Sequence, residues 1–177
     1  MTRKLHIGGR VPAPGWEILD AVEGPHVDHL GNANDLSRFA DGTFEALYAS
    51  HVLEHFDYKD ELGETLREWW RVLQPGGFLY VSVPDLEVLA RLFIDRERLS
   101  QQERFQVMRM MFGGHMDDYD YHKVGLDQDL LANYLFAAGF TNLWKMERFG
   151  LFEDTSELQV KGQPISLNIR AERPRGD

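Results

Sequence analysis

The segment from His51 to His55 carries side chains whose types and spacing suggest a specific chemistry. His51, Glu54 and His55 form the pattern H-x-x-E-H. In zinc-dependent peptidases, two histidines spaced in this way on a long helix bind zinc, and the glutamate activates a water molecule. Here the apolar run Phe44–Ser50 reads as a strand that ends directly before the motif, so the long helix is missing. A zinc hydrolase therefore remains only an alternative.

Small and polar residues follow the predicted strands, which is where open α/β sheets bind their ligands. They are Gly8 and Gly9 after the first strand, Asp20 after the second, Asn32 after the third, Ser50 and His51 after the fourth, and Asp85 after the fifth. Glycine lets a ligand approach the backbone closely, and an acidic residue after the second strand can accept hydrogen bonds from a ribose diol. These residue types are also common in turns, so each position has a purely structural alternative.

A second polar cluster lies further along the chain. His115 and His122 are candidate general bases, because histidine titrates near neutral pH. Asp117, Asp118 and Asp120 could bind a hard cation together with His122. Acidic side chains in loops are more commonly just solvated, and we expect no bound metal.

Short apolar runs separated by turn residues dominate the first half of the chain. Residues 5–7, 16–19, 26–30 and 44–49 are predicted strands. An amphipathic helix is predicted over 62–73, because its apolar residues recur at spacings of three and four. Pro75-Gly76-Gly77 should end that helix, and a strand over 78–83 should follow. Strand, helix and strand in this order predict a parallel crossover and an α/β fold.

The second half is predicted to be more helical. Helices are expected over 86–99, from Ser100 to the glycines at 113–114, and over 128–138, and two closing strands over 141–149 and 165–171. Glu103 follows Ser100 at the spacing of a capping box. With no linker or repeat in the sequence, we expect a single domain over 1–177, in which residues 86–126 form a cap over the substrate.

The gaps between the early strands are too short for ordinary crossover helices. Residues 9–15 and 21–25 separate the first three strands, whereas a parallel crossover normally needs a dozen residues or more. The helices of the N-terminal half should therefore be missing or reduced. We expect this half of the sheet to be thinly covered and to form a homodimer interface.

Composition excludes several classes of function. The 177 residues carry a net charge of −10, which argues against binding to nucleic acid or to an anionic membrane. The absence of cysteine excludes disulfides, thiolate zinc sites and a cysteine nucleophile. The first predicted strand begins by Lys4, which leaves no room for a signal peptide, and no apolar run reaches membrane-spanning length. These features predict a cytoplasmic protein.

Several stretches, in this order and spacing, resemble the short class I S-adenosylmethionine-dependent methyltransferases. They are Lys4-Leu-His-Ile-Gly-Gly9, Gly15-Trp-Glu-Ile-Leu-Asp20, Gly31-Asn-Ala-Asn-Asp-Leu36, the segment from Phe44 to Ser50-His-Val-Leu-Glu-His55, Leu66 to Arg71-Val-Leu-Gln-Pro-Gly-Gly77 and Ala138-Gly-Phe140. The resemblance runs from about residue 4 to about residue 145. It implies a Rossmann-like, doubly wound, mostly parallel sheet of the seven-stranded type, with reduced helices in the N-terminal half.

The resemblance also implies a cofactor, S-adenosylmethionine, and roles for the residues that bind it. Gly8 and Gly9 would line its methionine portion, Asp20 would hold the ribose hydroxyls, Asn32 and Ala33 would lie beside the adenine, and Ser50 and His51 would close the pocket. The family's first loop usually has a third glycine where this chain has Arg10. Arginine there would crowd the methionine portion or pair with its carboxylate. The alternative is a non-catalytic methyltransferase-like interaction module.

The function implied by this resemblance is methyl transfer to a hydroxyl or amine of a small molecule or glycan. Family members associated with surface polysaccharides favour a sugar as the acceptor. A hydroxyl acceptor needs a general base, and the candidates are His122, Asp85 and His51. His122 lies in a stretch, Asp120 to Gly125, that resembles a recurring segment of the short family members.

Overall fold

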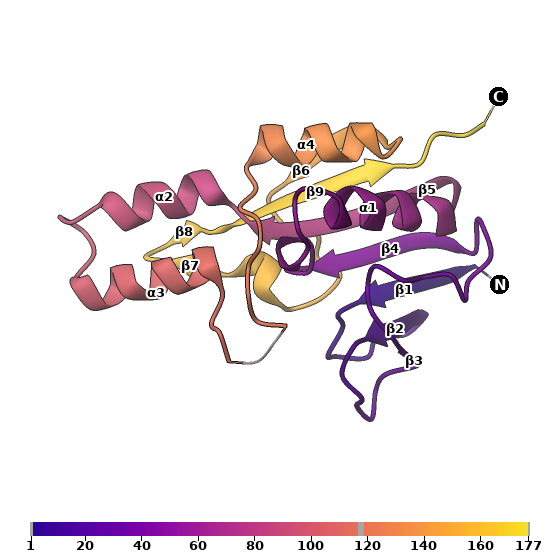
Figure 1. Ribbon diagram of the computed structural model, residues 1–177, viewed down its shortest axis with the longest axis horizontal. Coiled ribbons are helices and arrows are strands. Elements are labelled where there is room, and N and C mark those ends of the chain that lie inside the picture. The colour runs from indigo at the N-terminus through magenta and orange to yellow at the C-terminus, as the bar shows by residue number, and fades with distance from the viewer. Residues whose placement is uncertain (1, 117–118, 177) are drawn as a thin grey trace.

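The computed structural model describes residues 2–116 and 119–176 and is built around a seven-stranded sheet (Figure 1). The strands lie in the order β3-β2-β1-β4-β5-β9-β6. Their bounds are Arg3–Ile7 (β1), Trp16–Asp20 (β2), His29–Leu30 (β3), Phe44–Ser50 (β4), Leu73–Pro84 (β5), Thr141–Met146 (β6) and Ser166–Glu172 (β9). The pairings among β1 to β5 are parallel, whereas β9 runs antiparallel to its neighbours β5 and β6. The strand order reverses between β1 and β4, as in a doubly wound sheet, so the predicted fold class is confirmed.

The helices that cover the sheet lie mainly on one face. The α-helices are Glu61–Val72 (α1), Leu86–Ile94 (α2), Gln101–Phe112 (α3) and Gln128–Ala137 (α4), and the short 3₁₀ helices are Leu53–His55 (η1) and Thr155–Glu157 (η2). Helices α1 and α4 contact each other and pack on the sheet (Figure 1). The stripe of α1 formed by Leu62, Leu66 and Trp69 is fully buried in the main core. This burial accounts for the predicted amphipathic helix.

The turn Pro75-Gly76-Gly77 differs from its prediction. Helix α1 ends before it, at Val72, but β5 already begins at Leu73 and includes these residues. Leu73 pairs with Phe44, and the register then shifts before regular pairing resumes at Phe78. The turn residues therefore form an irregularity inside the strand, because the chain enters the sheet directly from the helix.

No helix connects β1 to β2 or β2 to β3 among the residues that the structure describes, which confirms the prediction from the short gaps. The opposite face of the sheet is partly covered by the connection between β6 and β9. Phe149 and Phe152 of this connection pack against Tyr48 of β4, and Phe152 also contacts the rings of His6 and Trp16. Aromatic side chains thus replace part of the missing helical layer.

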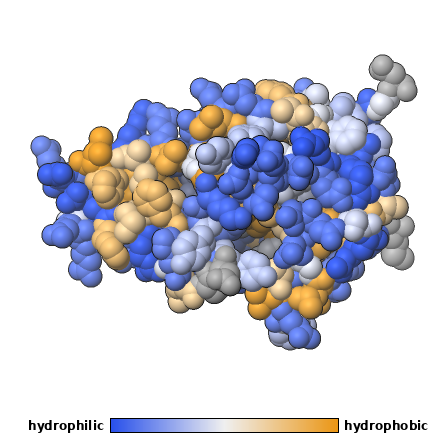
Figure 2. All heavy atoms as spheres, in the orientation of Figure 1, coloured by the Kyte–Doolittle hydropathy of each residue, from blue (hydrophilic) through white to orange (hydrophobic). Residues whose placement is uncertain are grey.

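Helices α2 and α3 form a lobe with its own small core (Figure 1). The predicted capping box is present, since the Ser100 and Glu103 side chains bond each other's backbone amides. The helix predicted over 86–99 ends earlier, at Ile94, where Asp95 leaves the helical conformation. Figure 2 shows apolar side chains gathered on this lobe. The exposed ones include Phe93, Ile94, Phe105 and Phe112.

Two shorter features complete the fold. The strand predicted over 26–30 is reduced to His29–Leu30, because the Val27 amide donates to the Gly24 carbonyl in a turn. A small hairpin, β7 (Gln159–Val160) with β8 (Gln163–Pro164), precedes β9. Among the described residues, no helix has both the length and the apolar character needed to cross a bilayer.

Candidate functional site

The residues predicted to bind ligand meet at one edge of the sheet. The Gly8 amide donates to the Leu19 carbonyl, and the Gly31 amide donates to the Asp20 carbonyl, so the ends of β1, β2 and β3 are tied together. The amide of His51 likewise donates to the Ser82 carbonyl of β5. This edge includes the point between β1 and β4 where the strand order reverses, which is the expected binding crevice of such a sheet.

The loop after β1 is shaped by its glycines. Gly8 has a φ of +72°, and a Cβ at this position would lie 2.9 Å from Cγ2 of Val52. At Gly9, a Cβ would lie 2.7 Å from the ring of His6. Neither position therefore tolerates a side chain. The Gly8 backbone is exposed, whereas Gly9 is buried. Arg10, which directly follows these two glycines, is exposed.

Asp20, Asn32 and Ala33 lie along the same edge. The Asp20 carboxylate accepts a hydrogen bond from the Val22 amide at 2.7 Å, which orients it at the end of β2. The Ala33 backbone is held by helix α1, because its carbonyl accepts a hydrogen bond from Nε1 of Trp69 at 2.8 Å. Asn32 is exposed. A bare glycine backbone, a carboxylate and an amide in sequence fit a ligand with an amino-acid end, a ribose and an adenine but no phosphate.

Ser50 has a partner that the sequence did not predict. Asp154 accepts hydrogen bonds from the Tyr48 hydroxyl at 2.8 Å and from the Ser50 hydroxyl at 3.3 Å. Burial raises the pKa of Tyr48 well above its usual value, so the phenol stays protonated and remains a donor. No local pattern reveals this contact, because Asp154 lies more than one hundred residues from Ser50 along the chain.

His51 directly follows β4 in the left-handed conformation, with a φ of +55°. Its Nε2 lies 2.9 Å from Oγ of Ser166, and its Nδ1 lies 3.5 Å from Oε1 of Glu54. Burial, reinforced by the nearby His122, lowers the pKa of His51 to about 4. The imidazole is therefore neutral at physiological pH.

Glu54 is at the centre of this part of the site. Its side chain is only 2% exposed, and neither carboxylate oxygen has a hydrogen-bond partner among the described residues. Burial raises the pKa of Glu54 to about 8. His122 Nε2 lies 4.0 Å from Oε1, and the rings of His55 and His122 stand 5.0 Å apart.

The structure does not support the peptidase interpretation of the H-x-x-E-H pattern. Only Leu53–His55 is helical, as a single 3₁₀ turn, and the left-handed His51 precedes it. The two histidines therefore do not share one face of a long helix. Glu54, which would have to reach a water molecule, is buried instead.

His122 is brought to Glu54 by the loop after α3. The His122 amide donates to the Phe112 carbonyl, and the amide of the next residue, Lys123, donates to the backbone carbonyl of Glu54 at 2.7 Å. Gly113 has a φ of +89°, and a Cβ there would collide with the backbone carbonyl of Asp120. Glycine therefore lets the loop close on itself and return His122 to the sheet edge.

Other candidate residues have different surroundings. Asp85 is the N-cap of α2, where its carboxylate accepts from the amides of Glu87 and Val88. His115 stacks on the ring of Tyr121 with centroids 4.1 Å apart. Asp120 accepts from the Met116 amide. Asp117 and Asp118, the other acids of the predicted hard-cation cluster, lie outside the described residues.

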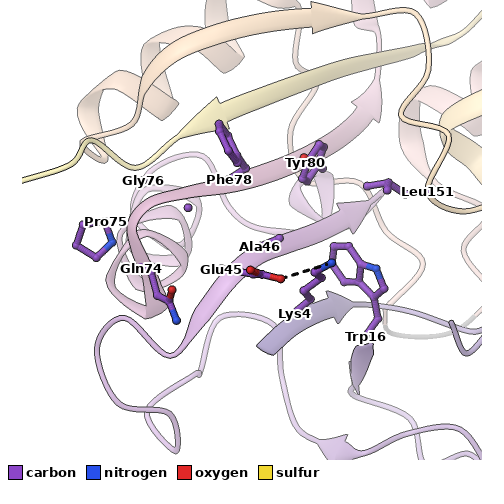
Figure 3. Close-up of a pocket in the computed structure, with 11 residues that line it drawn as sticks. Lys4, Trp16, Glu45, Ala46, Gln74, Pro75, Gly76, Phe78, Tyr80 and Leu151 are labelled. Carbon is purple, nitrogen blue, oxygen red and sulfur yellow. Dashed lines mark ion pairs between the residues drawn. The ribbon is translucent and has the colours of Figure 1, made fainter. Parts of the chain in front are cut away.

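The sheet also carries a hollow away from the strand ends (Figure 3). A cavity of about 400 Å³ is lined by the early parts of β4 and β5, with Lys4, Trp16 and Leu151 beside them. Lys4 and Glu45 pair across it, with Nζ 3.5 Å from Oε1. None of the predicted cofactor residues lines it.

Comparison with known proteins agrees with the fold. The methyltransferase domain family matches residues 19–81, the segment from β2 to β5. No curated protein matches the sequence. This chain is similar in structure to a Thermotoga maritima S-adenosylmethionine-dependent methyltransferase, a possible histamine N-methyltransferase. That comparison gives a TM-score of 0.61 and 20% identity, over 98% of this chain and 82% of that one.

Two further solved structures show the same fold. A Burkholderia thailandensis 1,6-didemethyltoxoflavin N1-methyltransferase with bound S-adenosylhomocysteine gives a TM-score of 0.59 and 14% identity, over 98% of this chain and 72% of that one. A possible exported protein of Bordetella parapertussis gives a TM-score of 0.58 and 14% identity. That comparison covers 98% of this chain but only 63% of the Bordetella protein. The central segment thus matches the methyltransferase domain family, and the fold is that of S-adenosylmethionine-dependent methyltransferases.

Proposed function

We propose that this enzyme transfers the methyl group of S-adenosylmethionine to a hydroxyl or amine of a small molecule or glycan. The observation that supports this proposal is the row of polar side chains and glycine backbone at the strand ends, which continues directly into His51. Bound there, the sulfonium of the cofactor would supply an electrophilic methyl group. Methyl transfer then needs little beyond positioning and, for a hydroxyl, removal of one proton.

We assign cofactor binding to the residues of the first three strand ends. The backbone at Gly8 and Gly9 would accept the methionine portion, the Asp20 carboxylate the ribose hydroxyls, and Asn32 with Ala33 the adenine. Ser50 would close the pocket from β4, held in place by Asp154. The exposed guanidinium of Arg10 would pair with the carboxylate of the methionine portion.

We assign the general base to His51. It is neutral at physiological pH because burial lowers its pKa to about 4. It also directly follows the strand that would close the cofactor pocket. Asp85 is a weaker candidate, because its carboxylate is engaged in capping α2. Residues 86–126 would form the wall that selects the acceptor. The net charge of −10 disfavours a polyanionic acceptor such as a nucleic acid.

Calorimetric titration with S-adenosylmethionine and S-adenosylhomocysteine tests the proposal directly. Asp20→Ala should weaken binding of both ligands by about tenfold or more, because the ribose loses its charged hydrogen-bond acceptor. Glu23→Ala, which removes an exposed acid three residues away, is the matched control and should bind like the wild type. Absence of binding at millimolar ligand, or equal affinity in the Asp20 and Glu23 variants, would contradict the proposal.

A further inference from the structure

Glu54 presents an electrostatic problem that the methyl-transfer site does not explain. Its carboxylate is almost fully buried, and within the described part of the chain neither oxygen accepts a hydrogen bond. Folded proteins rarely leave a buried carboxylate without a partner, because the desolvation cost is several kcal/mol or more. The groups that face it, His51, His55 and His122, are all imidazoles.

The hydrogen bonds of His51 determine which of its ring nitrogens is protonated. The Ser166 hydroxyl donates its only proton to the Thr155 carbonyl at 2.8 Å. The 2.9 Å contact between Ser166 and Nε2 of His51 must then be a bond donated by His51. Nδ1 of a neutral His51 therefore carries a lone pair, and this lone pair lies 3.5 Å from Oε1 of Glu54.

The same argument applies to the other two histidines. Nδ1 of His55 lies 3.1 Å from the Tyr121 carbonyl, which can only accept, so Nε2 of a neutral His55 carries the lone pair. At His122, backbone hydrogen bonds with Met111 and Met110 oppose the lowering of its pKa by burial. Its Nε2 faces Glu54 at 4.0 Å. Backbone carbonyls of this kind orient the histidines of metal sites from the second shell.

Three of these residues already have the geometry of a ligand set. One ligand atom each from Glu54, His55 and His122 lie within 4.8 Å of one another. Bonds of about 2.1 Å to a tetrahedral ion place ligand atoms about 3.4 Å apart, so the three side chains need to close by at most about 1.4 Å. A cation at their centre would satisfy the carboxylate and the lone pairs of His55 and His122, and would leave the Nδ1 lone pair of His51 free.

We propose that Glu54, His55 and His122 bind a divalent first-row transition-metal ion of the zinc class. Two imidazole nitrogens and one carboxylate oxygen suit such an ion, whereas magnesium and calcium prefer oxygen ligands alone. This arrangement differs from the peptidase pattern, because Glu54 is a ligand and His122 replaces His51. It also replaces the expectation from the sequence that no metal is bound.

The position of this site gives the ion a role that rests on the proposed methyl transfer. The cluster adjoins His51 at the end of β4, where the acceptor would approach. Three protein ligands leave a coordination position open to an acceptor hydroxyl, whose pKa the ion would lower. His51 would then take the hydroxyl proton as the oxygen attacks the methyl carbon. The methyl–sulfur bond breaks in the same step and leaves neutral S-adenosylhomocysteine.

The test is calorimetric titration of the full-length, EDTA-treated protein with Zn²⁺, with Mg²⁺ in a parallel experiment. Substitution of Co²⁺ adds a visible spectrum that reports the coordination. The wild type should bind one equivalent of zinc with a dissociation constant in the micromolar range or below. Glu54→Gln and His122→Asn should each weaken zinc binding at least a hundredfold. Circular dichroism should confirm that both variants are folded.

Two matched controls separate this site from adventitious histidine binding. His115→Asn changes a histidine of the same loop that stacks on Tyr121, and His26→Asn changes an exposed histidine elsewhere. Both should bind zinc like the wild type. The proposal is overturned if the wild type binds no zinc at 100 µM, if folded Glu54→Gln retains its affinity, or if only Mg²⁺ binds.

The two titrations test the proposed metal site and the proposed function separately. Binding of S-adenosylhomocysteine without zinc binding would overturn the metal site alone. Zinc binding without any affinity for S-adenosylmethionine or S-adenosylhomocysteine would instead leave the metal site intact and contradict the proposed function.

Discussion

His6 shows how one side chain can couple the stability of the sheet to pH. The imidazole is 4% exposed, it packs edge-on to Tyr48 and against Phe152, and its Nδ1 has no hydrogen-bond partner among the described residues. Burial is the main cause that lowers its pKa to about 4, despite the opposing influence of Asp154. A protonated His6 is therefore far less favourable in the folded protein than in the unfolded chain.

The expected consequence is a loss of stability on acidification. Below pH 6.5 His6 becomes protonated in the unfolded chain but stays neutral in the folded protein. The free energy of unfolding therefore falls as the pH is lowered to about 4. The contribution of His6 at pH 4 is on the order of 3 kcal/mol. His6→Gln should remove this contribution, so its unfolding free energy, measured by urea denaturation at pH 7 and pH 4, should change less than that of the wild type.

His26→Gln is the control for that experiment, because His26 is exposed in a turn. Its pH profile should run parallel to that of the wild type. His51 and His122 have lowered pKa values for the same reason, burial, so some acid sensitivity should remain in His6→Gln. Identical pH profiles for His6→Gln and the wild type would contradict the assignment.

At the scale of elements, the loop between α3 and α4 decides where His122 lies. Gly113 has a φ of +89° and no room for a Cβ beside the Asp120 carbonyl. Gly113→Ala should therefore force the loop open and cost about 1–3 kcal/mol of unfolding free energy. It should also abolish high-affinity zinc binding, because His122 would move away from Glu54.

Gly150→Ala provides the comparison for the loop variant. Gly150 also has a positive φ, +65°, but nothing lies within 4 Å of a Cβ there. This variant should show only the smaller cost of backbone strain, about 1 kcal/mol, and should keep its zinc affinity. Thermal denaturation and calorimetry measure both effects. A Gly113 variant that binds zinc normally would show that the loop does not position the ligand.

The sequence predicted the elements whose causes are local. The structure contains the helix predicted from the apolar spacing of α1 and the capping box predicted at Ser100. It also lacks helices beside β2 in the described residues, as the short gaps predicted. The residues at the strand ends could be assigned to one edge because parallel strands end together. Tertiary contacts decided the rest: Asp154 and Ser166 reach Ser50 and His51 from more than one hundred residues away, and no periodicity encodes such a contact.

The proposed metal cluster likewise combines residues that the sequence pattern revealed with one that only a tertiary contact brings to them. His51, Glu54 and His55 were visible as a motif, and His122 was a separate candidate. Their combination depends on the return of the loop after Gly113, which places the Lys123 amide on the Glu54 carbonyl. The motif also suggested a helix, whereas the chain makes only one 3₁₀ turn after the left-handed His51.

At the scale of the whole molecule, the uneven covering of the sheet is the most unusual property. Helices α1 and α4 pack on one face (Figure 1). The other face is covered in part by aromatic side chains of the β6–β9 connection, which pack against Tyr48. The hollow beside this connection exposes the Lys4–Glu45 pair (Figure 3). We propose that a second copy of the chain covers this hollow, because a two-fold axis could exchange the two charges between copies.

Light scattering at micromolar concentration tests this dimer. The wild type should have twice the mass of the chain, and Lys4→Glu should shift it toward the monomer, since acids would then face Glu45 of both copies. High salt should weaken the wild-type dimer in the same direction. Lys59→Glu, in the exposed loop before α1, is the control and should remain dimeric. A wild type that stays monomeric at high micromolar concentration would refute the dimer.

The bonds from Asp154 and Ser166 back to β4 also determine when the site can exist during synthesis. Ser50 and His51 leave the ribosome early, but their partners Asp154 and Ser166 are more than one hundred residues behind them. Contacts of such long sequence separation form late, because the intervening loop must close first. A nascent chain that has completed β4 and β5 therefore lacks the side chains that orient Ser50 and His51. The part of the site formed by Ser50 and His51 is therefore completed only after β9 has paired with β5 and the β6–β9 connection has packed against β4.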